Sequence, residues 1–181
     1  VKEAFYIART GRPGVVVIDV AKDVFDAQID YRYPSAVKLH GYTGDVSFDP
    51  AAVRAAAEAL AAAEQPLLFV GGGVVLSDTA EIRELLRLTG MPSVVTLMGI
   101  GGIAAETEGF TGMAGMHGSY ASNMAIQECD LLLAVGTRFS DRVTGNTAAF
   151  APKARIVHFD IDPAELNKNV RADIPVIGDL R

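Results

Sequence analysis

The stretch Leu131-Leu-Leu-Ala-Val-Gly-Thr-Arg-Phe-Ser-Asp-Arg-Val-Thr-Gly145 combines a short apolar run with a charged, glycine-bounded segment. The run 131–135 is continuous and apolar, as in a strand buried on both faces. Residues 136–145 would then lie at the carboxyl end of that strand, where open α/β sheets bind their ligands. Arg138 and Arg142 can clamp a pyrophosphate, and Asp141 can orient an arginine or accept from a ribose. A solvated turn is the alternative interpretation of the same residues.

Further apolar runs, each short and rich in branched residues, alternate with helical patterns along the chain. Such alternation predicts an α/β fold in which helices cover both faces of a parallel sheet. We expect a Rossmann-like, three-layer domain with a six-stranded parallel sheet over residues 49–181. Residues 1–22 are predicted as a helix tail, a turn and a strand at 15–20, and 23–48 as a linker. The other expected strands are 67–70, 93–97, 131–135, 155–159 and 174–177.

The helix signals are local. Asp49-Pro50 is an N-cap followed by proline at the first helical position, and it opens an alanine-rich helix that runs to about residue 64. Asp78 and Glu81 form a capping box for a second helix, which Gly90 ends. Two short helices are expected from about Ser119 and over 163–166, and a glycine- and methionine-rich loop is expected before Ser119.

Composition excludes several classes of protein. The formal charge of −6 disfavours nonspecific binding to nucleic acid or to an anionic membrane. The chain has one cysteine, Cys129, which excludes an internal disulfide, fits a reducing cytoplasm and is predicted to be buried and inert. Three scattered histidines disfavour a structural zinc site, so no metal ligands are predicted. No apolar run reaches the ~20 residues that a membrane span needs. There is no signal peptide, and Val1 begins within a pattern, as in a fragment of a longer chain.

Other motifs admit a ligand or a plain structural role. Gly71-Gly72-Gly73 directly follows a predicted strand and can bring backbone against a phosphate or a ring, but Leu76 stands where a dinucleotide fingerprint has its third glycine. This disfavours an ordinary NAD-dependent dehydrogenase. The loop from Met98 to Ser119 offers methionines to a flat aromatic ligand, or is a mobile surface loop.

Two acids follow the predicted strand 155–159. Asp160 can accept from ribose hydroxyls, whereas Asp162 is expected to cap the next helix. His158 lies within the strand and is predicted to be a satisfied core residue.

A set of motifs in order resembles the large subunit of acetohydroxyacid synthase, also called acetolactate synthase. The segment Arg138–Gly145 is similar to the family's signature, with Ser140 where the family usually has an acid. The resemblance covers essentially the whole chain, and it implies that residues 1–22 are the C-terminal end of the family's pyrimidine-binding domain and 49–181 its central domain. Its further motifs are Thr10–Gly14, Thr96–Gly99, Gly115–Gly118, His158–Pro163, Asn167–Asn169 and Gly178-Asp179.

This resemblance implies a thiamine-diphosphate-dependent enzyme of branched-chain amino-acid biosynthesis that condenses two 2-oxoacids, with FAD bound structurally by this central domain. Lys22 and Arg142 would lie toward the substrate channel, although Ala21 stands where the family usually has proline. Thiamine diphosphate and Mg²⁺ would be bound by other domains, so no catalytic residue is expected within this chain. The residues implied at the flavin are Arg12, Gly71, Gly72, Gly73, Thr96, Leu97, Met98, Gly115, Met116, His117, Gly118, Gly136, Thr137, Arg138, Asp141, Arg142, Asp160, Ile161 and Asp179.

The resemblance also implies a homodimer or tetramer that works with a small regulatory subunit in the cytoplasm. Two alternatives stay open from the sequence. One is another FAD-containing thiamine-diphosphate enzyme, glyoxylate carboligase or pyruvate oxidase. The other is a dinucleotide-binding module without chemistry of its own.

Overall fold

The computed structural model describes residues 1–42, 44, 46–77 and 79–180, and the chain divides into two units, Val1–Val46 and Ser47–Arg181. The first unit holds two helices, α1 (Lys2–Arg9) and α2 (Lys22–Asp26), and its other described residues are irregular. Helix α1 ends in a turn in which the Tyr42 hydroxyl donates to the Thr10 carbonyl at 2.9 Å. The predicted helix tail and turn are therefore confirmed.

The strand predicted at residues 15–20 is wrong. The segment is extended but pairs with no described residue, and Val15 is 95% exposed. An apolar, β-branched run becomes a strand only where a neighbouring strand satisfies its N–H and C=O groups. This run finds no such neighbour.

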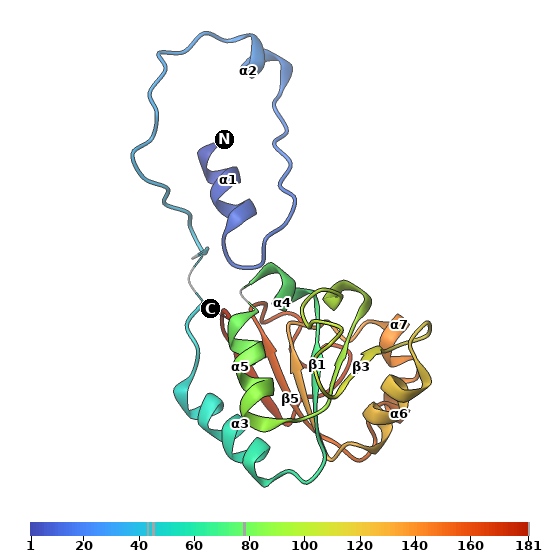
Figure 1. Cartoon of the computed structure of the whole chain (residues 1–181). Coiled ribbons are helices and arrows are strands. Elements are labelled where there is room, and N and C mark those ends of the chain that lie inside the picture. Colours follow the sequence, from blue (N-terminus) through green and yellow to red (C-terminus); the bar gives the residue numbers. More distant parts are fainter. Residues whose placement is uncertain (43, 45, 78, 181) are drawn as a thin grey trace. The chain divides into compact units, whose positions relative to one another are not determined.

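The second unit is built on a six-stranded, all-parallel sheet, which confirms the predicted fold class (Figure 1). Its strands stand in the order β3-β2-β1-β4-β5-β6, and each neighbouring pair is parallel. Their bounds are β1 (Pro66–Val70), β2 (Ser93–Val95), β3 (Phe110–Met113), β4 (Leu131–Val135), β5 (Arg155–Asp160) and β6 (Ile174–Ile177).

Strand β3 lies inside the segment that was predicted as a loop. It has the sequence Phe-Thr-Gly-Met, its register against β2 shifts, and Gly112 has a φ of 102°. A four-residue edge strand with a glycine carries no clear apolar pattern, so it could not be predicted from the residues alone.

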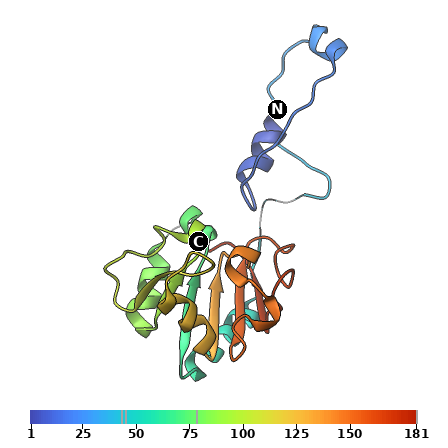
Figure 2. The same ribbon diagram turned by 90° about the vertical axis from the view of Figure 1, so that its right-hand side faces the viewer.

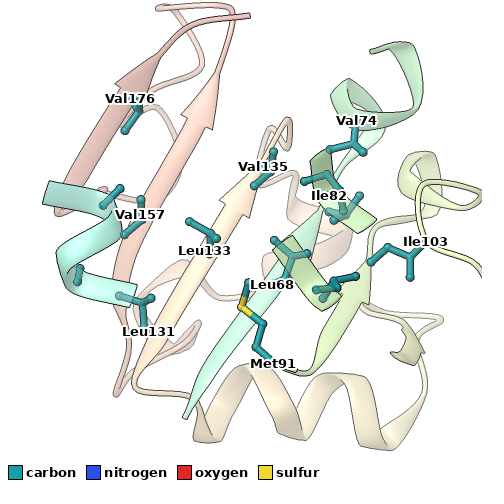
Figure 3. Packing of buried hydrophobic residues seen from close by; sticks show 14 of the residues in the cluster. Leu68, Val74, Ile82, Met91, Ile103, Leu131, Leu133, Val135, Val157 and Val176 are labelled. Atoms are coloured by element: carbon teal, nitrogen blue, oxygen red, sulfur yellow. The ribbon is translucent and has the colours of Figure 1, made fainter. Parts of the chain in front are cut away.

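The two faces of the sheet follow from the alternation of side chains along each strand. Leu131, Leu133 and Val135 of β4 point into one hydrophobic cluster, and Leu132 and Ala134 point into the other. Figure 3 shows the first cluster, to which the helices on that face add side chains such as Val74 and Ile82. Figures 1 and 2 show the sheet lying between α3 and α5 on one side and α6 and α7 on the other. Three layers result.

The helices begin and end largely where their caps predicted. Asp49 accepts from the Ala51 N–H at 2.9 Å, Gly90 is left-handed at φ 62°, and Ser119 accepts from the Ser122 N–H at 3.0 Å. Asp78, the start of the predicted capping box, lies outside the described residues, and Thr79 is the N-cap of α5. The bounds are α3 (Pro50–Ala62), α4 (Gly72–Leu76), α5 (Ala80–Thr89), α6 (Tyr120–Glu128) and α7 (Asp141–Thr144), with 3₁₀ turns η1 (Leu97–Gly99) and η2 (Thr147–Ala149).

The helix predicted at 163–166 is wrong, because these residues form turns. Asp162 does cap them, since its Oδ1 accepts from the Ala164 N–H at 3.0 Å. Asn167 then has a φ of 60°, and its Oδ1 accepts from the Ala172 N–H. A left-handed residue so soon after the cap leaves no room for a helix.

Cys129 is buried, as predicted. Burial raises the pKa of its thiol to about 12, so the reactive thiolate is scarcely formed near neutral pH.

Candidate functional site

The candidate site lies at the carboxyl edge of the sheet, which is the set of segments that follow the strands β1 to β6. The strand order runs outward from β1 through β2 to β3 on one side and from β4 through β5 to β6 on the other. The chain therefore reverses direction between β1 and β4, whose last residues, Val70 and Val135, are paired. Open α/β sheets bind ligands at such a topological switch point.

The glycine triplet after β1 packs directly against the segment after β4. The Gly71 N–H donates to the Val135 carbonyl at 2.9 Å, and the Gly73 N–H donates to the Gly136 carbonyl at 3.0 Å. A Cβ on Gly71 would stand 2.1 Å from the Gly136 oxygen, and one on Gly136 would stand 2.7 Å from the Gly73 Cα. These glycines are thus needed for the contact between two backbones, and the N–H groups of Gly71 and Gly73 are already used within the chain.

The segment after β2 turns at once into η1 and presents two apolar side chains. Thr96 caps this turn by accepting from the Gly99 N–H, and a Cβ on Gly99 would stand 2.3 Å from the Val70 carbonyl oxygen. Leu97 and Met98 are 66% and 72% exposed. Since a Cβ on Gly72 would be only 3.1 Å from the Met98 Cβ, the β1 and β2 segments lie side by side.

The turn at Gly115–Gly118 is fixed through its first two residues. Asn123 of α6 holds Gly115 twice: its Oδ1 accepts from the Gly115 N–H at 2.9 Å, and its Nδ2 donates to the Gly115 carbonyl at 3.0 Å. The Met116 N–H donates to the Arg142 carbonyl at 2.9 Å, which joins this turn to α7. Met116 is 67% exposed, and His117 is also exposed. The turn is therefore rigid in its backbone and open in its side chains.

The segment after β4 alternates buried and exposed residues. Thr137 and Phe139 are 4% and 1% exposed, whereas Arg138 between them faces solvent. Asp141 opens α7 and pairs with Arg142 at 3.0 Å, with both side chains about three-quarters exposed. An ion pair this exposed contributes only ~0–1 kcal/mol to stability. The three charges are thus available to a ligand at little cost to the fold.

The end of β5 carries a buried acid beside a buried imidazole. Asp160 is 7% exposed, and its Oδ1 accepts from the Asp162 N–H at 2.9 Å. The His158 Nε2 lies 2.8 Å from the Thr137 carbonyl oxygen, while its Nδ1 has no hydrogen-bond partner in the described part of the chain. His158 is in the core as predicted, but it is only half satisfied. Burial lowers its pKa, outweighing the Thr137 carbonyl and the nearby carboxylates of Asp160 and Glu165.

The structure thus brings most of the predicted site residues to one edge. Ile161 and Asp179 follow the ends of β5 and β6, half-buried, and the Gly178 N–H donates to the Asp160 carbonyl. Arg12 and Lys22 belong to the first unit, where Arg12 is exposed and Lys22 pairs with Asp26 at 2.6 Å. Their part in the site stays a prediction.

Three residues with a structural bearing on this edge were not singled out for it from the sequence: Asn123, His158 and Asn169. Asn169 donates to the Phe139 carbonyl at 3.1 Å. A polar residue on a helix or in a turn gives no sequence signal that it will hold a distant backbone. The buried position of His158 in an apolar strand was the one available hint.

A metal-binding cluster and a membrane-spanning helix are two further features that a chain of this kind could have. Over residues 1–42, 44, 46–77 and 79–180, no group of three or more His, Cys, Asp or Glu side chains is placed to hold a metal ion. Within the same described part of the chain, no helix is long and apolar enough to cross a membrane.

Comparison with known proteins agrees with this arrangement. Residues 53–181 match the family described as thiamine pyrophosphate enzyme, central domain. The chain belongs to this family.

Three similar proteins are named as acetolactate synthases. The chain is 48% identical to the acetolactate synthase large subunit of Mycobacterium tuberculosis over 99% of its own length and 29% of the relative. It is 50% identical to a probable acetolactate synthase large subunit of Methanocaldococcus jannaschii over 99% of its length and 31% of that protein. It is 46% identical to the isozyme 2 large subunit of Escherichia coli K12 over 98% of its length and 32% of that protein. The chain thus spans about a third of the length of each of these relatives.

Proposed function

We propose that this chain is the central, FAD-binding part of a longer acetolactate synthase that condenses two 2-oxoacids for branched-chain amino-acid biosynthesis. The observation that carries the proposal is the layout of the carboxyl edge. Backbone contacts fix the segments after β1, β2, β3 and β4 against one another, and these segments leave two kinds of side chain exposed. The relatives' shared name supports the reaction.

The exposed side chains fit a flavin dinucleotide. Arg138 is the donor for the pyrophosphate, since arginine pairs with such oxygens in a bidentate, charge-assisted way. Leu97, Met98 and Met116 offer apolar, adaptable surface to the flat ring. Asp160 and Ile161, at the end of β5, lie where a ribose is bound in related folds. In the family that the chain resembles, FAD has a structural role and does no net redox work.

Thiamine diphosphate does not fit this chain in the same way. The described residues offer no acidic cluster for Mg²⁺, and Gly178-Asp179-Leu180 lacks the second glycine of the diphosphate motif that the resemblance implies. We therefore assign the thiamine diphosphate and Mg²⁺ sites to other parts of the longer protein. Lys22 and Arg142 are assigned to the substrate channel, and a homodimer or tetramer with a small regulatory subunit is the proposed cytoplasmic assembly.

The test uses the full-length protein and the 181-residue chain side by side. The full-length protein should show a flavin absorbance spectrum and form acetolactate from pyruvate with thiamine diphosphate and Mg²⁺. The chain alone should form none, and it should bind FAD weakly, because ring burial supplies ~25 cal/mol per Å² and part of that area belongs to other domains. A full-length protein that holds nicotinamide, or no flavin, would contradict the proposal.

A further inference from the structure

His158 reaches across from β5 to the backbone that follows β4. Its side chain is fully buried, and its Nε2 lies 2.8 Å from the Thr137 carbonyl oxygen. Because a carbonyl oxygen can only accept, the Nε2 carries the proton and Nδ1 holds a lone pair. None of the described residues forms a hydrogen bond with that Nδ1. The Asp160 carboxylate is 3.8 Å from the Nε2, too far for a hydrogen bond.

The cost of this arrangement calls for an explanation. Burying an imidazole with one orphaned nitrogen is unfavourable, and an apolar side chain of similar size would pack among the same neighbours without that cost. What an apolar residue could not do is satisfy the Thr137 carbonyl, which belongs to a residue that is 4% exposed. The imidazole is therefore matched to one backbone oxygen.

The same short segment is held at a second point. Phe139 has a φ of 49°, which is strained for an aromatic residue, and its ring meets the His158 ring edge to face at 4.8 Å between centroids. Its carbonyl accepts from the Asn169 Nδ2 at 3.1 Å. The residues on both sides of Arg138 are thus fixed, and Arg138 alone of the three projects into solvent.

We propose that His158 is a positioning residue, which fixes the Thr137–Phe139 backbone so that the Arg138 guanidinium is presented to the pyrophosphate of FAD. The inference rests on the proposed function, because it takes the segment after β4 to be the flavin-binding loop. His158 itself touches no ligand, and acts through the Thr137 carbonyl and the Phe139 ring.

The experiment measures FAD affinity and urea unfolding of the full-length protein and its variants. His158→Leu removes the donor and keeps an apolar side chain, and we expect it to weaken FAD about fivefold to tenfold, the loss of one buried hydrogen bond. His158→Gln should recover most of the affinity, because its amide reaches the position of Nε2. Val157→Ala, on the same strand but facing the other cluster, is the control: it should lower stability and leave FAD affinity within about twofold.

A double-mutant cycle separates positioning from general loss of structure. If His158 acts through Arg138, then His158→Leu should have little further effect on FAD affinity once Arg138→Ala is present. If the leucine variant does not fold, His158→Asn replaces it, because its shorter amide ends near the Nδ1 position and cannot reach the Thr137 carbonyl.

The outcomes are distinct. Wild-type affinity in His158→Leu, or in His158→Asn where that variant replaces it, would overturn the positioning role while leaving the flavin site in place, and so would full additivity with Arg138→Ala. A wild-type protein that binds no FAD would instead overturn the proposed function, and the inference with it.

Discussion

The carboxyl edge of the sheet has an inner layer and an outer layer, and different forces hold them. The inner layer consists of buried contacts between backbones, or between one side chain and a backbone. The outer layer consists of side chains that project from those fixed segments. Inner-layer residues are Gly71, Gly73, Asn123, Gly136 and His158, and outer-layer residues are Leu97, Met98, Met116, Arg138, Asp141 and Arg142.

The difference between the layers shows how a site can have a fixed backbone while the side chains that would bind a ligand stay exposed. Two backbones that touch where a glycine leaves no room for a Cβ fix the position of a segment. An exposed arginine, by contrast, contributes little to the stability of the fold. Inner-layer substitutions should therefore change stability and ligand binding together. Outer-layer substitutions should change ligand binding alone.

The largest expected effect is that of Gly71→Ala. Its Cβ would stand 2.1 Å from the Gly136 carbonyl oxygen, which is backbone and cannot swing aside. We expect the free energy of unfolding to fall by roughly 3 kcal/mol, the upper part of the range for overpacked sites. Gly72→Ala is the matched control, since its new Cβ would meet Met98 at 3.1 Å, and it should cost well under ~1 kcal/mol. If Gly71→Ala and Gly72→Ala lowered the free energy of unfolding in urea by equal amounts, the contact between Gly71 and Gly136 would not be the cause of the loss.

Asn123→Ala should come next. The substitution leaves the N–H of the buried Gly115 without its partner, whereas the Gly115 carbonyl loses the Asn123 amide but still accepts from the Gly118 N–H. We expect a loss of about 1–3 kcal/mol in stability, as for one orphaned buried group. In the full-length protein FAD affinity should fall as well, because the Met116 turn loosens. Asn123→Asp keeps an acceptor for the Gly115 N–H, so its stability should lie between those of the wild type and of Asn123→Ala. Unchanged hydrogen exchange at Gly115 in the alanine variant would contradict the expectation.

Arg138→Ala tests the outer layer. We expect FAD binding to weaken by roughly 1.5–3 kcal/mol, the range for a hydrogen bond to a charged group, with the urea midpoint unchanged. Arg142→Ala in the same segment is the control, and it should affect turnover more than flavin retention. Titration calorimetry and an acetolactate assay measure the two separately. If both variants kept near-wild-type FAD affinity and turnover, the segment 136–145 would be a solvated turn with no role in binding.

The smallest effect concerns pH. Burial lowers the pKa of His158 below its ordinary value of 6.5, despite Asp160 and Glu165 nearby. The unfolded chain therefore binds a proton that the folded chain does not, so stability is complete above about pH 6.5 and falls as the pH decreases below it. One group limits this slope to about 1.4 kcal/mol per pH unit. The fall in the free energy of unfolding below about pH 6.5 should be less steep in His158→Gln. If the wild type and this variant showed the same dependence of stability on pH, His158 would not be its cause.

Much of the fold was predictable because its signals are local. Continuous apolar runs gave β1, β4, β5 and β6, and caps such as Asp49, Gly90 and Ser119 set helix ends within a residue or two. Such signals depend on the preferences of a few adjacent residues, which hold wherever the segment finds a partner. Within the candidate site, the Arg138–Arg142 segment was found for the same reason: it directly follows an unmistakable strand.

Tertiary structure alone decided the rest. Val15–Val20 has as strong a strand pattern as Leu131–Val135, yet only the second is paired on both sides. Phe110–Met113 has a weak pattern and is a strand because β2 lies beside it. Likewise the sequence by itself placed glycines, arginines and an imidazole near strand ends, but it could not show that Gly71 contacts Gly136 or that His158 holds Thr137. These contacts join residues 21 to 65 positions apart, and their geometry depends on the twist and order of the whole sheet.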